Sequence, residues 1–217
     1  MEDGFYGLPI TVESEDGNTY YIEPFQATKE SIDYLWEKAG KYSFLFSDIT
    51  REDRNRFDQA VLSPGTILLT VFQKDDPGRK AVGVVLADKI TPKWDANVHY
   101  IFWDKIQKGR HRVLLVALSW LMEELDLKRV TAEIMEYAYA GLRRAKHLGF
   151  LLEGRKRDAT IWRGDTADVF LFGVLREELV NTNAIANCYI ERTPEEASWF
   201  GLLDDKYALA HAMTKER

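Results

Sequence analysis

Hydrophobic and polar residues alternate along several stretches of the chain, and this two-residue period predicts β-strands. In 128–136, for example, Val130, Ala132 and Ile134 fall on one face. Other strand candidates are rich in β-branched residues and end at Gly, Pro or Asp clusters. The expected strands cover residues 10–12, 19–22, 66–73, 81–90, 97–103, 128–136, 150–162 and 166–175.

Four further stretches carry apolar residues at helical spacing. The expected helices cover about 28–39, a short stretch from Thr50, 113–125 and about 138–149. Thr28 and Thr50 are suitable N-caps, because a threonine hydroxyl can accept a hydrogen bond from a free backbone N–H at a helix start. In chain order, the elements predict an α+β fold with a mostly antiparallel mixed sheet and helices on both of its faces.

Residues 181–217 predict a C-terminal helical extension that follows a domain covering 1–180. Thr193, Pro194 and two glutamates form a capping box with proline at the first helical position. Aromatic residues such as Trp199 and Phe200 make this stretch too apolar for a disordered tail. We expect it to pack on the domain or on a second subunit, which would make a homodimer.

Composition narrows the class of protein. Hydrophobic residues make up 46% of the chain and charged residues 29%, which is usual for a soluble globular protein. No apolar run reaches the roughly 18–20 residues of a membrane span, and the first residues lack the basic start of a signal peptide. The single cysteine, Cys188, excludes an intramolecular disulfide framework or a thiolate metal cluster. We therefore expect a cytoplasmic protein with no membrane partner and no metal site.

The formal net charge is −6, and no long basic block is present. Nucleic-acid binding needs many Lys and Arg contacts to phosphates, so we expect no nucleic-acid partner. An acidic surface suits a basic acceptor such as an amine, although it is also simply a charged surface that keeps a protein in solution.

A run of motifs links the last helix and strands of the predicted domain. It consists of Ala132 and Ile134, Arg143, Leu148-Gly149-Phe150, Leu152-Glu153-Gly154, Arg157-Asp158, and Asp168, Gly173 and Leu175 on the last strand. In this order and spacing, the run resembles the GNAT superfamily, and within it the branch of ribosomal-protein N-terminal and small-amine acetyltransferases. The resemblance implies a GNAT acyltransferase fold, acetyl-coenzyme A as cofactor, and transfer of an acetyl group to a protein N-terminus, a lysine or a small amine.

The local backbone and the core explain why several of these residues occur at their positions. Gly149 follows a helix, where a left-handed backbone costs other residues roughly 1 kcal/mol or more. Phe150 should then enter the core. Gly154 should allow a bend or bulge in its strand.

The resemblance places the cofactor pyrophosphate at the loop between the strand ending near Trp103 and the apolar helix. A helix start offers free N–H donors and about half a positive charge, which suits a phosphate. The related loop has two small residues, whereas this chain has only Gly109, surrounded by cations that can also hold phosphate. The residues expected to bind the cofactor are Ile101, Phe102, Trp103, Gln107, Lys108, Gly109, Arg110, His111, Arg112 and Arg143.

Acetyl transfer needs a neutral amine, and therefore a base or a water chain near the thioester. His99 is the first candidate base, because it lies on the strand before this loop and can titrate near neutrality; its alternative role is a strand histidine bonded to a neighbour. Glu136 and Tyr137, at the end of the next strand, could also act on the acceptor, but Tyr137 could equally be a wall. The resemblance also places Glu23, Asp33 and Trp36 on the acceptor side.

A second function stays open. Three features depart from the pattern: the single-glycine loop, Ala138 in place of the related family's asparagine, and the aromatic C-terminal extension. They favour a catalytically degenerate GNAT-fold module that binds or assembles. The enzyme is the leading hypothesis, because a thioester is already activated and transfer depends mainly on positioning.

Overall fold

An eight-stranded mixed sheet forms the centre of the computed structural model, which describes residues 9–13, 17–40, 53–74, 76, 78, 80–103 and 110–179. The strands are β1 (Ile10–Glu13), β2 (Thr19–Pro24), β3 (Ile67–Gln73), β4 (Ala81–Thr91), β5 (Asp95–Phe102), β6 (Arg129–Met135), β7 (Leu151–Trp162) and β8 (Asp165–Leu175). Their order across the sheet is β1-β2-β3-β4-β5-β6-β8-β7. The predicted extension, 181–217, lies outside the described residues.

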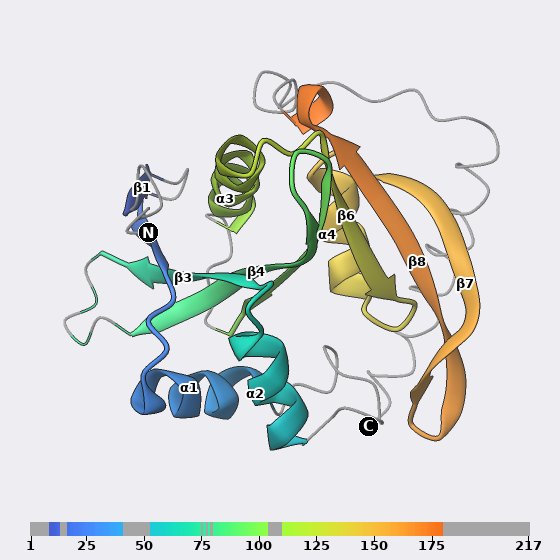
Figure 1. Ribbon diagram of the computed structural model, residues 1–217, viewed down its shortest axis with the longest axis horizontal. Helices are drawn as coiled ribbons and strands as arrows, with labels where there is room; N and C mark the ends of the chain where they lie inside the picture. The colour runs from blue at the N-terminus through green and yellow to red at the C-terminus, as the bar shows by residue number, and fades with distance from the viewer. Residues whose placement is uncertain are drawn as a thin grey trace. The chain divides into compact units, whose positions relative to one another are not determined.

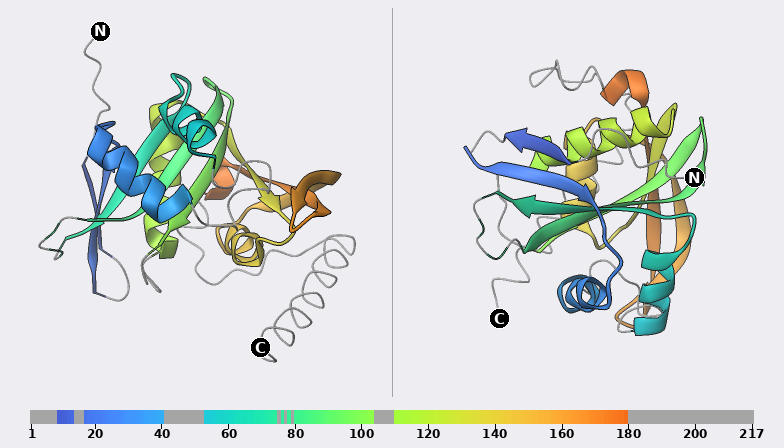
Figure 2. Two further views of the ribbon diagram at one scale, coloured as in Figure 1. Left: turned by 90° about the horizontal axis from the view of Figure 1, so that it is seen from below. Right: turned by 60° about the vertical axis from the view of Figure 1, so that its left-hand side comes forward.

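The helices are α1 (Lys29–Leu35), a π-helical stretch η1 (Trp36–Gly40), α2 (Arg54–Leu62), α3 (Arg110–Glu124) and α4 (Tyr139–His147). Figure 1 shows α1 and α2 on one side of β3 and β4 and α3 on the other side, and the right-hand view of Figure 2 agrees. Helices on both faces of the sheet were predicted, and this is confirmed.

Strand pairing is antiparallel throughout the described sheet except between β5 and β6. The predicted hairpin at the start of the chain is present as β1 and β2, and Gly17 in its turn has φ +80°. Because α3 carries the chain from β5 back to the start of β6, these two strands run parallel. The predicted mostly antiparallel mixed sheet is thus confirmed.

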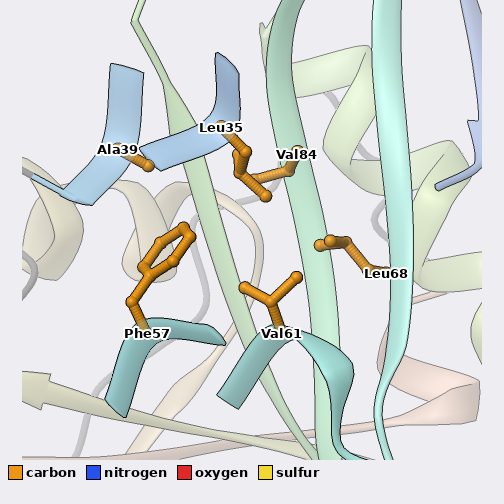
Figure 3. Close-up of a cluster of buried hydrophobic side chains, with 6 residues drawn as sticks. All are labelled: Leu35, Ala39, Phe57, Val61, Leu68 and Val84. Atoms are coloured by element: carbon orange, nitrogen blue, oxygen red, sulfur yellow. The ribbon is translucent and has the colours of Figure 1, made fainter. Parts of the chain in front are cut away.

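Side chains alternate across β3 and β4, so each strand supplies both faces. On one face, the helices α1, η1 and α2 close a core cluster, drawn in Figure 3, that consists of Leu35, Ala39, Phe57, Val61, Leu68 and Val84. On the other face, Leu69 and Val85 are almost fully buried on the side where α3 lies. The sheet is therefore a core layer between two layers of helix.

The first helical region departs from the prediction in one respect. Thr28 is the N-cap of α1, as predicted, but the continuation after Leu35 is π-helical rather than α-helical. The Trp36 ring lies where a Cβ at Gly40 would stand, so only glycine leaves room for it. The N-cap of α2 is Asp53, whose carboxylate accepts from the Arg56 N–H at 3.1 Å, and Thr50 lies outside the described residues.

The structure confirms the predictions for Gly149 and Gly154, which lie at and just after the junction between α4 and β7. Gly149 has φ +86°, and the Phe150 N–H donates back to the Ala145 carbonyl at 3.0 Å, which ends the helix. Phe150 is buried. At Gly154 the pairing of β7 with β8 shifts its register, which is the predicted bulge.

In the part of the chain that the structure describes, no helix combines the length and the apolar character needed to cross a membrane.

Candidate active site

Strands β5 and β6 meet at a single residue pair and then part. The register of the parallel pair is Asn97 opposite Thr131, with no further partners between the two strands. On their outer sides both strands stay paired, β5 with β4 as far as Phe102 and β6 with β8 as far as Met135. The facing edges beyond Asn97 and Thr131 therefore border a slot whose backbone N–H and C=O groups are not paired across it. Such groups need other partners, which a ligand or water can supply.

One face of the sheet beside the slot is basic. Helix α3 begins at Arg110, and its guanidinium carbon lies 5.8 Å from the centre of the Phe102 ring on β5. His111 is half-buried and Arg112 is exposed. The start of a 15-residue helix adds the positive end of its dipole to this charge. Gln107, Lys108 and Gly109, which were predicted to bind the cofactor, lie outside the described residues.

Tyr100 lies on this same face. Its hydroxyl is buried without a hydrogen-bond partner in the part of the chain that the structure describes. Burial raises the pKa of Tyr100 well above its ordinary value, and the charges of Arg144 and Arg110 act in the opposite direction. Arg144, on α4, thus adds a second arginine near the slot. Arg143, the predicted residue, is exposed on the same helix.

The opposite face carries a polar cluster around His99. Its Nε2 lies 3.3 Å from Oδ1 of Asp88 on β4 and 3.1 Å from Nδ2 of Asn97. The His99 side chain is 42% exposed, so a substrate can reach the ring. Burial raises the pKa of Asp88, but the hydrogen bond and charge of His99 and the charge of Lys89 outweigh it, so the pKa is lowered overall. Asp88 is a residue that sequence reasoning missed.

Glu136 and Tyr137 lie across the slot from His99, just beyond the end of β6. The Tyr137 ring is buried and stacks on Trp162 at the tip of the β7–β8 hairpin, with 4.4 Å between centroids and 9° between planes. The Arg163 guanidinium lies 4.4 Å from the other ring of this stack, that of Trp162. The Glu136 N–H donates to the Asp168 carbonyl at 2.9 Å. The stack joins the end of β6 to the β7–β8 hairpin.

The residues predicted for the acceptor side separate into two groups. Asp33 is held by Lys29 and Arg54, at 2.6 and 2.9 Å, and these hydrogen bonds lower its pKa. Trp36 packs edge-on against Phe57 at 5.1 Å. Both therefore help to join α1 to α2. Glu23 instead lines a cavity beneath α1.

Ile101 and Trp103 point to the face covered by α1. Both pack against the core cluster, and the Trp103 indole N–H donates to the Ala81 carbonyl at 2.8 Å. Together with Phe102, they give the end of β5 an apolar and aromatic surface on both sides of the sheet.

Solved structures place this architecture among known proteins. No family model matches the sequence, and no curated protein matches it. Solved structures do match: spermidine N-acetyltransferase from Vibrio cholerae, in complex with CoA and spermine, has a TM-score of 0.61 at 14% identity, over 75% of this chain and 98% of that one. The chain has the GNAT fold.

Two further structures have the same fold. The ribosomal-protein-S5-alanine acetyltransferase from Vibrio fischeri has a TM-score of 0.60 at 17% identity, over 78% of this chain and 98% of that chain. A GCN5-related N-acetyltransferase from Brucella melitensis has a TM-score of 0.61 at 18% identity, over 82% of this chain and 87% of that chain. The predicted GNAT fold is confirmed. Because the neighbours act on different acceptors, the narrower resemblance to the ribosomal-protein branch stays a prediction.

Proposed function

We propose that this protein transfers an acetyl group from acetyl-coenzyme A to an amine. The observation that carries the proposal is the divergence of β5 and β6 after the single pair Asn97 and Thr131. It leaves unpaired backbone edges beside a helix start, and acetyl-coenzyme A carries both the amides that can pair with a strand edge and the phosphates that suit a helix start. Structural neighbours with this fold are acetyltransferases, and one was solved with CoA.

The residues around the slot fit this ligand. Arg110 and Arg144 bring two guanidinium groups, which bind phosphate well because of their planar fork of donors. Arg112 and His111 extend the basic surface on the first turn of α3. When bound, acetyl-coenzyme A supplies an activated acyl group as a thioester. The protein then has to position the thioester, bind the amine beside it and accept a proton from the amine.

His99 is the residue proposed to take that proton. An amine at neutral pH is mostly protonated, and it attacks only after losing a proton to a base. In the tautomer whose Nε2–H donates to Asp88, Nδ1 is the ring nitrogen that accepts a proton from the amine. The carboxylate of Asp88 stabilises the imidazolium that forms and holds the ring in place. The proton then leaves to solvent, to which the His99 side chain is open.

Two measurements test the proposal. Acetyl-coenzyme A binding is measured by isothermal titration calorimetry, and release of free coenzyme A thiol is measured with spermidine and with an alanine-initiated peptide as acceptors. We expect binding, and turnover with at least one amine. His99→Gln should lower kcat by about 10²–10⁴-fold with unchanged cofactor affinity. Glu123→Gln, on the exposed side of α3, is the matched control.

The outcomes separate the two functions. Absence of acetyl-coenzyme A binding would overturn the proposal. Binding without turnover over a broad amine panel would favour the degenerate module instead. Turnover that His99→Gln leaves unchanged would keep the acetyltransferase but remove His99 as its base.

A further inference from the structure

A cavity lies under α1, and its described lining includes neither His99 nor Asp88. It has a volume of about 480 Å³ and is bounded by α1, the segments at the ends of β2 and β3, the start of β4, and Trp103. This volume lies within the range of small-molecule sites, about 300–1,000 Å³. Apart from Glu23 and Trp103, its lining residues have no part in the proposed acetyl transfer.

Aromatic rings form much of its lining. They come from four separate segments and are those of Phe25, Tyr34, Phe72 and Trp103. Two of these rings are fixed by one acceptor, because the Tyr34 hydroxyl and the Trp103 indole N–H both donate to the Ala81 carbonyl, at 3.0 and 2.8 Å. Their centroids lie 6.1 Å apart, with planes at 74°. Since both ring donors already bind Ala81, what these two rings offer a ligand is their π-surface. The Lys38 ammonium already lies over the Tyr34 ring, 5.6 Å from its centroid, so a ligand would meet the remaining ring surface.

The charges around the cavity favour a cation. Glu23 and Glu30 line it, against Lys80 as the one basic residue among its described lining. A reciprocal capping box at the start of α1 uses two of the backbone donors that an anion could bind: the Ser31 N–H donates to Thr28 Oγ1 at 3.2 Å, and the Thr28 N–H donates to Ser31 Oγ at 3.0 Å. Glu30, in the first turn of α1, adds further negative charge there.

We propose that this cavity binds the ammonium group of a small organic cation. A cation over aromatic rings is attracted by their negative faces, and several rings around one site with carboxylates nearby form a recognised type of ammonium site. The fixed corner of Tyr34 and Trp103 presents its ring surfaces before a ligand arrives, which reduces the entropy cost of binding. The proposal does not depend on acetyl transfer.

The test compares choline with 3,3-dimethylbutan-1-ol, its neutral isostere, by isothermal titration calorimetry on the full chain without coenzyme A. We expect choline to bind at least about tenfold more tightly than the alcohol, because only the charged ligand gains the ring and carboxylate attraction. The experiment is repeated with n-butylammonium and 1-pentanol, to cover a primary ammonium. Equal binding of cation and neutral isostere in both pairs, or no binding at all, would overturn the proposal.

Two variants locate the site. Phe72→Leu keeps an apolar side chain but removes a ring, and Glu30→Gln removes a charge at nearly constant shape. Each should weaken cation binding several-fold and leave the neutral isostere unchanged, whereas Glu123→Gln should change neither. A cation preference that survives both lining variants would place the binding elsewhere and refute the assignment. Circular dichroism of each variant shows that it is folded, and His99→Gln, which tests acetyl transfer, should bind choline normally.

Discussion

Nε2 of His99 lies 3.3 Å from Oδ1 of Asp88, across the pairing of β4 with β5. Asn97, the residue at which β5 last pairs with β6, joins this contact through its side-chain amide, 3.1 Å from the same nitrogen. The point where the sheet divides is therefore also where a half-exposed imidazole meets a carboxylate. This arrangement gives the candidate base a fixed orientation.

Asp88→Asn should lower kcat for acetyl transfer by at least about tenfold, because the neutral amide no longer stabilises a protonated His99. The KM for acetyl-coenzyme A should stay the same, since Asp88 is not among the residues proposed to hold the cofactor. Steady-state kinetics at saturating amine measure both constants. A rise in the KM for acetyl-coenzyme A with an unchanged kcat would contradict this role.

The lowered pKa of Asp88 also predicts how stability depends on pH. Because its pKa is lower in the folded state, Asp88 contributes stability above the unfolded value of about 3.9, and this is lost as the pH falls through the folded pKa. Urea unfolding between pH 3 and 7 should show wild type losing more stability than Asp88→Asn below about pH 4. Parallel curves for the two proteins would argue against the shift.

Arg144 and Arg143 give a direct comparison at the slot. The charge of Arg144 acts on the buried Tyr100, whereas Arg143 is exposed. Arg144→Gln should therefore weaken coenzyme A binding by about tenfold, and Arg143→Gln should have a smaller effect. Calorimetry on both variants decides between them, and the reverse order would favour the residue indicated by the family pattern.

His147 offers a probe of anion binding on α4. Burial lowers its pKa, and the charges of Arg144, Arg143 and Lys146 lower it further. Its folded pKa thus lies below the unfolded one, so the folded state loses stability as the pH falls through the ordinary range of histidine. A phosphate bound near these arginines should raise the pKa of His147, which an NMR titration with and without coenzyme A would detect. An unchanged titration would place the phosphates away from α4.

Gly83 lies on β4 opposite Phe102 of β5. A Cβ there would lie 2.7 Å from the Ile101 carbonyl oxygen and would also collide with the Phe102 ring. Gly83→Ala should therefore lower the free energy of unfolding by about 1–3 kcal/mol. Gly65→Ala is the control, because its Cβ would enter open space, and it should change stability by less than about 0.5 kcal/mol. Urea unfolding compares the two, and equal stabilities would show that β4 and β5 adjust without cost.

Local signals in the sequence were enough for much of the fold. The caps, turns and bulges depend on neighbours a few residues away, so Thr28, Gly149 and Gly154 could be assigned from the chain alone. The start of α2 was placed at Thr50, since Thr50 and Asp53 are both good N-caps and only the structure shows Asp53 in that role. The π-helical stretch after Leu35 depends on a ring over Gly40, which helical spacing does not reveal.

The site was harder to predict, because its contacts join distant parts of the chain. His99 could be proposed from its strand and its chemistry, but Asp88 belongs to the neighbouring strand and becomes its partner only through the register of β4 and β5. Arg144 was passed over in favour of Arg143, since the motif fixes a position on α4 but not the side of the helix that faces Tyr100. The cavity under α1 assembles rings from four segments, and no single stretch of sequence indicates it.

The sheet is continuous in its strand order, yet its two parts share only one rung, Asn97 with Thr131. An extended ligand bound beyond that rung could supply the hydrogen bonds that β5 and β6 do not make with each other. Ligand binding and the connection between the two parts of the sheet would then be coupled. Ligand binding would then tie β5 to β6 beyond their one rung, in addition to the contacts that α3 makes with β1, β2 and β6.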